Sequence, residues 1–558
     1  MAYAYHHPSN NQELIDPRFV VGFLPRSPGF IYRPILHTVQ VLDPRLGVAL
    51  QCHPSVIIHM DVQRSISLRQ FMAEEGLVPS PEEGQKRKVV IEKLKEIVRL
   101  WIQEVGRQRD LPENVIEAAS ATILTFGSYG LGVEYFVMSY VLSFKTGHLY
   151  VIERASYDGD EKLLMLKVHG SESDIDALCI GPWFASIEED FFIHLYDFLK
   201  NTPEVSDIYC IKGAKVPLMR FKLEGISVDL PYARLQVMSV PENVDLLNPV
   251  FLTSIDEVSW KSISGVRVNQ CILQLVPNLK NFQSLLRCIK FWAKRRGVYG
   301  NLFGFLGGVH LAILAAFICQ RSLNAGLSIL VMSFFDAFAG WPWPFPVALQ
   351  DGVMQIREDF NERRSWMPIR LPCTYEHCQS NITRSTFNRI KGELVRGQNI
   401  TRVGLLDTRP VFFMMTFYDD LTLNLLRPDF DWGDLFEPFV YRKTYPRFLK
   451  IYLSAGEKDD LVDWVGWVKS RFRSLILKLE DVQGFCDPNP TEYVETGDIE
   501  TEPGFVFYWG LNPSRLARFN VDLVEDYFWK NITNGYQGKV GKMRLTIVQA
   551  FKAAKQHK

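Results

Sequence analysis

Aspartates in short apolar segments are the residues of this sequence best suited to catalysis. Asp174 and Asp176 lie in Ser-Asp-Ile-Asp-Ala-Leu-Cys-Ile, and Asp229 lies in Gly-Ile-Ser-Val-Asp-Leu. In a strand, side chains two residues apart point to the same face, so the first pair is held side by side. Alone, that pair would more often be solvated surface residues. With Asp229 on a neighbouring strand, the set matches the ligands of paired Mg²⁺ ions in phosphoryl transfer.

A strand-like run upstream ends in Phe126, Gly127 and Ser128. A Gly-Ser turn can offer backbone N–H groups and a hydroxyl to phosphate oxygens. Considered alone, this turn is better explained as an ordinary strand-to-helix connection. Only together with the aspartates does the turn indicate a phosphate-binding site.

The elements that must position these residues follow from the hydrophobic pattern. An amphipathic helix of about twenty residues is expected after Pro79, where Ser80 and Glu83 have the spacing of a capping box. The other expected elements are strands over 122–126, 174–180 and 225–230, helices over 268–339, and mixed strands and helices beyond residue 405.

Length and composition indicate a folded protein with several domains. The chain has 558 residues, of which 47% are hydrophobic, 13% aromatic and 22% charged, and this excludes a wholly disordered, collagenous or coiled-coil protein. Its 62 Lys and Arg residues nearly balance 63 Asp and Glu residues. Any nucleic-acid site must therefore be a local basic patch.

The segment 302–319 is almost wholly apolar and follows the basic residues Lys294, Arg295 and Arg296. It contains glycines and His310, and its length is at the short limit for crossing a bilayer. A buried helix is therefore expected, and no membrane association.

The order of these parts is typical of the polymerase β-like nucleotidyltransferase superfamily. Further motifs narrow the resemblance to eukaryotic poly(A) polymerases of the nuclear type, with the plant branch closest, over about residues 66–545. These motifs are Phe-Gly-Ser-Tyr-Gly-Leu-Gly-Val, Asp-Ile-Asp-Ala-Leu-Cys-Ile-Gly-Pro, Leu-Val-Pro-Asn, Lys-Phe-Trp-Ala-Lys-Arg, Asn-Leu-Phe-Gly-Phe-Leu-Gly-Gly-Val, Phe-Asn-Glu-Arg and Trp-Val-Gly-Trp-Val.

The resemblance implies an enzyme that adds AMP from ATP to the 3′ end of mRNA or pre-mRNA without a template, using two Mg²⁺ or Mn²⁺ ions. Asp174 and Asp176 would hold both ions, and Asp229 the ion that activates the RNA 3′-hydroxyl. The implied ATP-binding residues are Phe126, Gly127 and Ser128, then Lys290 and Tyr299 at the triphosphate, and Asn301, Gly308 and Val309 at the adenine. Without the resemblance, Lys290 would be a solvated helix residue and Tyr299 an aromatic at the core edge.

The implied fold is a multi-domain α/β protein. It combines a palm-like mixed sheet, a helical central domain and a C-terminal RRM-like α/β sandwich that binds RNA. The expected divisions are a variable leader 1–65, a nucleotidyltransferase domain 66–240, a helical domain 241–400, an RRM-like domain 401–545 and a basic tail 546–558.

The sequence departs from the family pattern in several places. Residues 134–168 look inserted between the Gly-Ser turn and the first aspartate, Gly130 replaces a basic residue, and Ser264 replaces an asparagine near the nucleotide. These departures motivate an alternative, a catalytically impaired RNA-binding paralogue or splice form. A further alternative is a nucleotidyltransferase that adds CCA or uridine.

The resemblance also implies the partners. They are the RNA 3′ end, ATP, and cleavage and polyadenylation factors, with the enzyme itself a monomer. The implied location is the nucleus, with the cytoplasm as the alternative because no C-terminal localisation signal is evident.

Overall fold

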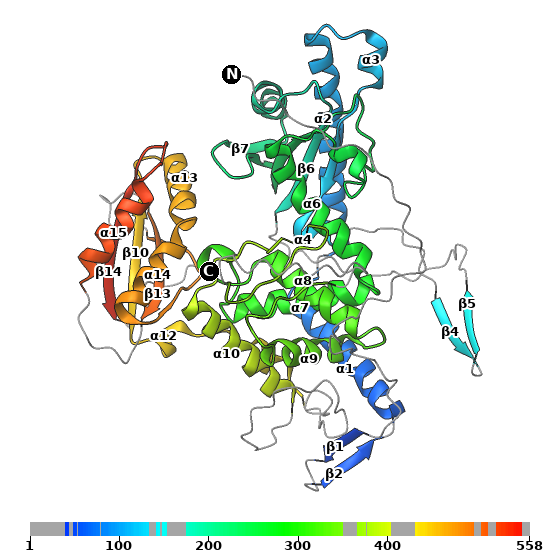
Figure 1. Ribbon diagram of the computed structural model, residues 1–558, viewed down its shortest axis with the longest axis vertical. Coiled ribbons are helices and arrows are strands. Elements are labelled where there is room, and N and C mark those ends of the chain that lie inside the picture. The colour runs from blue at the N-terminus through cyan, green and yellow to red at the C-terminus, as the bar shows by residue number, and fades with distance from the viewer. Residues whose placement is uncertain are drawn as a thin grey trace, which may run out of the picture.

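The predicted aspartates lie in a mixed β-sheet at the top of the molecule in Figure 1. This computed structural model describes residues 39–43, 48–52, 54–78, 80–132, 141–145, 148–152, 174–349, 365–374, 376–402, 430–495, 504–511 and 520–549. The sheet has the strand order β3-β6-β9-β8-β7, with β6 and β9 parallel and the other neighbours antiparallel. Its strands are β3 (Thr122–Thr125), β6 (Ile175–Gly181), β7 (Val205–Ile211), β8 (Leu218–Leu223) and β9 (Ile226–Arg234).

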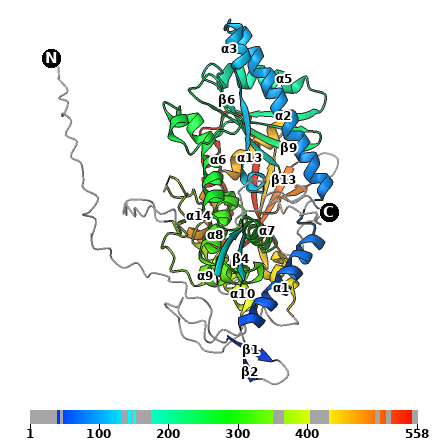
Figure 2. The ribbon, with the colours of Figure 1, turned by 90° about the vertical axis from the view of Figure 1, so that its right-hand side faces the viewer.

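The long helix α2 (Pro81–Gln108) packs against this sheet, as Figure 2 shows. The Ser80 hydroxyl caps the helix by accepting a hydrogen bond from the Glu83 N–H (3.2 Å), at the predicted position. Fully buried residues one turn apart, Leu94, Val98 and Trp101, face the sheet. The other helices of this domain are α3 (Glu113–Ala118), α4 (Gly127–Gly130), a π-helix over Ile187–Leu195 and α5 (Tyr196–Lys200).

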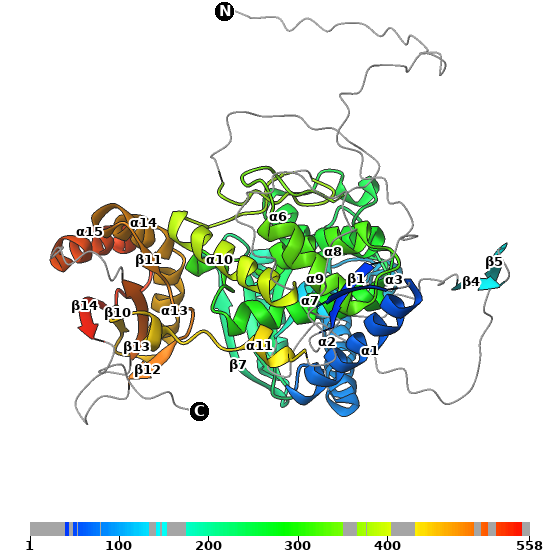
Figure 3. The ribbon, with the colours of Figure 1, turned by 90° about the horizontal axis from the view of Figure 1, so that it is seen from below.

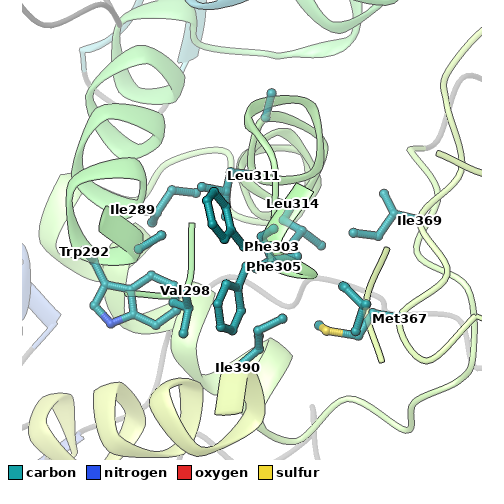
Figure 4. Close-up of a cluster of buried hydrophobic side chains, with 14 of the residues drawn as sticks. Ile289, Trp292, Val298, Phe303, Phe305, Leu311, Leu314, Met367, Ile369 and Ile390 are labelled. Atoms are coloured by element: carbon teal, nitrogen blue, oxygen red, sulfur yellow. The ribbon is translucent and has the colours of Figure 1, made fainter. Parts of the chain in front are cut away.

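A helical domain occupies the centre of Figure 1, and its core is drawn in Figure 4. Its elements are α6 (Glu257–Leu275), α7 (Leu279–Arg295), a 3₁₀ turn over Asn301–Phe303, α8 (Gly308–Arg321), α9 (Leu327–Ala339) and α10 (Arg384–Thr401). The apolar segment 302–319 supplies Phe303, Phe305 and Leu311 to this core. Among the described residues, none of the helices is both long and apolar enough to cross a bilayer. These findings agree with a buried helix.

Helix α1 (Pro54–Glu74) runs across residue 65, where the leader was expected to end. It packs on α9 in the central domain, where Leu68 and Met72 are fully buried. The Asp61 carboxylate accepts hydrogen bonds from the Gly326 N–H (2.7 Å) and the Ser328 hydroxyl (2.5 Å) at the start of α9. The end of the predicted leader thus packs on the central domain, the division of the chain into domains stays a prediction, and residues 1–38 lie outside the described residues.

Asp61→Ala is expected to destabilise the central domain by about 2 kcal/mol, because a carboxylate that caps α9 from another helix is lost. Amide hydrogen exchange should accelerate at Gly326 and Ile329, whose N–H groups bond to Asp61. The control is Gln70→Ala on the same helix, because Gln70 bonds only to the exposed Glu74 among its described contacts. Equal exchange rates in the two variants would contradict this role for Asp61.

The C-terminal domain is an antiparallel sheet with helices, at the left of Figures 1 and 3. The strands are β10 (Arg447–Ser454), β11 (Cys486–Asp487), β12 (Tyr493–Glu495), β13 (Gly504–Leu511) and β14 (Lys542–Gln549), with α13 (Lys458–Lys469), α14 (Phe472–Gln483) and α15 (Val521–Thr533). The short helices α11 (Trp432–Phe436) and α12 (Tyr441–Thr444) precede them. The mixed α/β content agrees with expectation, and its RRM-like character stays a prediction. Residues 550–558 of the predicted basic tail lie outside the described residues.

Buried ion pairs connect this C-terminal domain to the central helices. Arg296 forms a bidentate pair with Glu393 (2.6 and 3.0 Å). Arg389 contacts Glu393 at 2.5 Å and Asp487 at 3.2 Å. Burial raises the pKa of Asp487 to about 6. Because these charges are almost fully enclosed, losing one partner would leave its neighbour charged and unpaired in the interior.

Two antiparallel strand pairs lie apart from these domains in Figure 1. One joins β1 (Val39–Asp43) to β2 (Val48–Cys52). The other joins β4 (Val141–Lys145) to β5 (His148–Ile152) within the predicted insert 134–168, whose remaining residues lie outside the described residues. The insert therefore contains a hairpin, and Figures 1 and 3 place it away from the catalytic sheet.

Candidate active site

The structure brings the predicted carboxylates together at one end of the parallel strands. Asp174 immediately precedes β6, Asp176 is in β6, and Asp229 is in β9 as the register partner of Asp176. Burial, then Asp229, then Asp174 raise the pKa of Asp176 to about 7. Burial and Asp229 also raise the pKa of Asp174, the most exposed of the set. Burial is the larger cause of both raised pKa values, and the neighbouring carboxylates add to it; a divalent cation among them would relieve that repulsion.

The Phe126-Gly127-Ser128 turn lies directly against Asp176. The Phe126 N–H donates to the Asp176 carbonyl oxygen (2.9 Å), which extends the β3–β6 pairing into the turn. Gly127 has a φ of +60°, and a Cβ there would lie 2.1 Å from Asp176 Oδ2. Asn269 Nδ2 on α6 donates to the Gly127 carbonyl oxygen (3.0 Å). Glycine is therefore required for both the backbone conformation and the contact with the carboxylate.

The departure at Gly130 also has a steric explanation. Gly130 is buried, and a Cβ at this position would lie 2.6 Å from the Thr125 carbonyl oxygen and 3.0 Å from Asn269 Nδ2. A basic side chain at this position would therefore require the turn to shift. Ser264 on α6 is exposed, and its hydroxyl donates to the Lys261 carbonyl oxygen (2.6 Å).

Lys290 and Tyr299 lie on the side of the site formed by the central domain. Lys290 is near the end of α7, and its ammonium group is 5.9 Å from the centroid of the Tyr299 ring. The pKa of Lys290 is lowered to about 8, mainly by burial and also by the nearby charge of Lys294. Asp176 opposes this shift, because its charge raises the pKa of Lys290. Burial and Asp176 raise the pKa of Tyr299. Asp176 thus acts electrostatically on both Lys290 and Tyr299.

The residues predicted at the adenine lie around the start of α8. Gly308 is exposed, and a Cβ there would lie 3.4 Å from the Tyr299 hydroxyl. Val309 is also exposed, with 37% of its surface accessible. Asn301 is turned toward the loop before α10, because its Oδ1 accepts a hydrogen bond from the Asn381 N–H (3.2 Å). Gly308 is thus accessible beside Tyr299, and Val309 follows it as a second exposed residue, whereas the Asn301 side chain bonds to the loop before α10.

Arg220 belongs to the site although the sequence reasoning did not identify it. Its Nε and Nη2 donate to Oδ1 and Oδ2 of Asp229, both at 2.6 Å. Asp229 raises the pKa of Arg220, and Asp174 and Asp176 add to this effect. Arg220 also lines a cavity of about 360 Å³ between the catalytic sheet and α13, together with Tyr196, Tyr209, Lys212, Val462 and Asp463.

The donor set fits divalent cations. Asp174, Asp176 and Asp229 supply the oxygen ligands that Mg²⁺ and Mn²⁺ prefer, and Gly127 keeps side-chain atoms away from Asp176. Lys290 adds a positive charge suited to a triphosphate. The residue types therefore suit cations on the sheet side and a nucleoside triphosphate on the helix side. As they stand, no three metal-ligating side chains of the described residues are gathered closely enough to hold one ion, and Arg220 occupies both oxygens of Asp229.

The pH dependence of kcat/KM for ATP is expected to be bell-shaped. Asp176 takes up a proton below about pH 7 and Lys290 loses its charge above about pH 8, so activity falls in both directions. Added Mn²⁺ should move the acid limb to lower pH, because the cation and the proton compete for one carboxylate.

Lys290→Arg should move the alkaline limb of this profile upward, since arginine stays protonated. The control is Lys294→Arg, which keeps the charge of an exposed lysine on the same helix and should leave the limb in place. The measurement is RNA primer extension across the pH range. An alkaline limb at the same pH in wild type and Lys290→Arg would contradict the role given to Lys290.

Comparison with known proteins identifies the family. Residues 58–141 and 159–276 match the family model of the poly(A) polymerase nucleotidyltransferase domain, and residues 281–409 match that of the poly(A) polymerase central domain. The gap in the first match, 142–158, lies within the predicted insert. The chain is 51% identical to nuclear poly(A) polymerase 3 of Arabidopsis thaliana over 497 residues, covering 89% of this chain and 86% of that protein.

Further relatives are more distant. Nuclear poly(A) polymerase 4 of Arabidopsis thaliana is 35% identical, covering 78% of this chain and 53% of that protein. Among solved structures, a cytoplasmic RNA terminal U-transferase has 13% identity and a TM-score of 0.39, covering 68% of this chain and 99% of that chain.

These matches confirm the predicted resemblance and favour the enzyme over the impaired RNA-binding paralogue. The α/β fold with a nucleotidyltransferase sheet and a helical central domain is confirmed as well. The chain belongs to the nuclear poly(A) polymerase family, and it is a polynucleotide adenylyltransferase that adds AMP from ATP to RNA 3′ ends.

Proposed function

We propose that this chain extends mRNA or pre-mRNA by two-metal phosphoryl transfer at Asp174, Asp176 and Asp229. The observation that carries the proposal is the parallel register of Asp176 and Asp229, with Asp174 two residues earlier. Asp174 and Asp176 would hold both Mg²⁺ or Mn²⁺ ions, and Asp229 the one nearer the RNA 3′-hydroxyl. Such ions would supply Lewis-acid stabilisation of the attacking and leaving oxygens.

Helix α7 and the residues after it bind ATP. The RNA 3′-hydroxyl loses its proton to water as its oxygen forms a bond to the α-phosphorus of ATP. The bond from that phosphorus to the oxygen that bridges to the β-phosphate breaks, and pyrophosphate leaves. Lys290 and the Tyr299 hydroxyl neutralise and orient the triphosphate, and the Gly127-Ser128 turn assists them. Gly308 and Val309 line the adenine pocket.

The RNA 3′ end would approach Asp229 along the cavity beside Arg220. Tyr196 and Tyr209 supply aromatic rings there, and Lys212 and Arg220 supply positive charge. Aromatic rings stack on bases and basic groups pair with phosphates, which suits a single-stranded RNA of any sequence. The C-terminal domain, through α13, forms the opposite wall of this cavity and is the proposed RRM-like RNA-binding domain.

The nuclear names of two relatives support a nuclear location. Cleavage and polyadenylation factors as partners, and a monomeric enzyme, are proposed from the sequence resemblance alone. The cytoplasm is the alternative location.

The decisive experiment is extension of a labelled oligo(A) RNA by the full chain with ATP, CTP or UTP in turn. We expect a ladder with ATP that requires Mg²⁺ or Mn²⁺ and disappears with EDTA. Preferential incorporation of CTP or UTP would instead support a CCA- or uridine-adding enzyme. Extension that occurs only after deletion of residues 134–168 would support the impaired form.

A further inference from the structure

We propose that Arg220 couples RNA binding to cation binding: it competes with a divalent cation for Asp229, and an RNA phosphate releases it. The proposal rests on the proposed function, because it takes Asp229 as a cation ligand. It adds a positioning residue whose effect can be measured without catalysis.

The geometry of the pair is set by the sheet. Arg220 and Asp229 are register partners on the antiparallel strands β8 and β9, so their side chains share a face. Both oxygens of the carboxylate accept a hydrogen bond from the guanidinium at 2.6 Å. This bidentate arrangement is the strongest that arginine and a carboxylate form.

Arg220 already bonds to both oxygens of the Asp229 carboxylate, the atoms that a cation ligated by Asp229 would use. A divalent ion bound through these oxygens would lie within a few ångströms of the guanidinium, and two positive groups at that separation repel. The two partners differ in exposure, because the Asp229 side chain is 15% exposed and that of Arg220 is 47% exposed. Arg220 is therefore the partner that can leave.

The cavity beside the site offers Arg220 a second anion. Arg220 lines it with Lys212 and Tyr209, on the face toward α13. The guanidinium fork matches phosphate as well as it matches carboxylate. A phosphate of single-stranded RNA in this cavity would take over Arg220 and leave Asp229 to the cation.

The test measures Mn²⁺ binding by electron paramagnetic resonance, with and without an oligo(A) that ends in 3′-deoxyadenosine and cannot be extended. Without RNA, Arg220→Gln should bind Mn²⁺ about tenfold more tightly than wild type, the lower end of the effect usual for groups next to a metal ligand. RNA should tighten Mn²⁺ binding to wild type by about the same factor and leave Arg220→Gln unchanged.

The matched control is Lys222→Gln. Lys222 lies on the same face of β8 and pairs with the exposed Asp207, so its loss should not change Mn²⁺ affinity. Arg220→Lys is a second variant that keeps the charge without the fork, and its Mn²⁺ affinity should fall between wild type and Arg220→Gln. Mn²⁺ affinity that is the same in wild type and Arg220→Gln would overturn the coupling.

Asp229→Ala separates this failure from failure of the proposed function. If Asp229→Ala loses one bound Mn²⁺ ion while Arg220→Gln matches wild type, the cation site stands and the coupling is wrong. If Asp229→Ala binds as many ions as wild type, Asp229 is not a ligand and both proposals fail.

Discussion

Asp229→Ala and Asp174→Ala are each expected to lower the rate of RNA extension at least about 10³-fold, equivalent to about 4 kcal/mol of transition-state stabilisation. The reason is that Asp174, Asp176 and Asp229 converge at one end of β6 and β9 and share the task of holding the cations. Removing one carboxylate also relieves the repulsion on its neighbours. The pKa of Asp176 should therefore fall when Asp229 is replaced, because Asp229 helps to raise it.

The control for the aspartate variants is Asp207→Asn. Asp207 lies on β7 of the same sheet and pairs with Lys222 at the surface. Its φ of +51° is a conformation that asparagine tolerates, so the substitution removes charge without adding backbone strain. The assay is primer extension with ATP, and circular dichroism reports folding. Undiminished extension by both active-site variants would show that the cation site lies elsewhere.

Gly127→Ala is expected to lower extension by about 10²-fold, the cost of displacing a catalytic group by about 1 Å. Its Cβ would lie 2.1 Å from Asp176 Oδ2, so either the carboxylate or the turn has to move. The turn is held by Asn269 and by its hydrogen bond to the Asp176 backbone. The Asp176 carboxylate is therefore expected to move, and the affinity for cations should fall together with the rate of RNA extension.

Gly225→Ala provides a matched control for this substitution. Gly225 has a φ of +76°, similar to the +60° of Gly127, but a Cβ at Gly225 would meet nothing within 4 Å. Both variants bear the strain of a left-handed alanine, about 1 to 2 kcal/mol. Only Gly127→Ala adds the collision with Asp176. Equal extension rates in the two variants would mean that strain alone, and not the carboxylate, explains the glycine.

The carboxylates were predictable from sequence because they depend on local periodicity. Alternation along a strand places Asp174 and Asp176 on one face, and the parallel register of β6 and β9 adds Asp229. Arg220 was not predicted from the sequence. Arg220 and Lys222 point to the same face of β8, and only the pairing of β8 with β9 shows that Arg220, and not Lys222, lies opposite Asp229. A usable signal existed: Glu224-Gly225 forms a two-residue turn between β8 and β9, which places Arg220 opposite Asp229.

The packing of α1 on α9 could not be predicted from the hydrophobic pattern of the sequence. The residues before 65 show no sustained period, yet α1 begins at Pro54 and the family match begins at residue 58. The position of α1 depends on the contact of Asp61 with the start of α9. A local sequence pattern cannot predict a contact between residues so far apart in the sequence. Gly130 was interpreted as a lost charge, whereas the structure shows that a Cβ there would crowd the Thr125 carbonyl oxygen.

The docking of α1 onto α9 fixes an order of events during synthesis of the chain. Asp61 leaves the ribosome long before Gly326, which follows 265 residues later. At ordinary translation rates this interval lasts on the order of tens of seconds. The strands of the catalytic sheet lie between Asp61 and Gly326 in the sequence, so this sheet can fold in that time. Leu68 and Met72 stay exposed until the core that buries them has formed. During that interval the apolar face of α1 has no partner, so the core of the central domain is completed after the catalytic sheet has had time to fold.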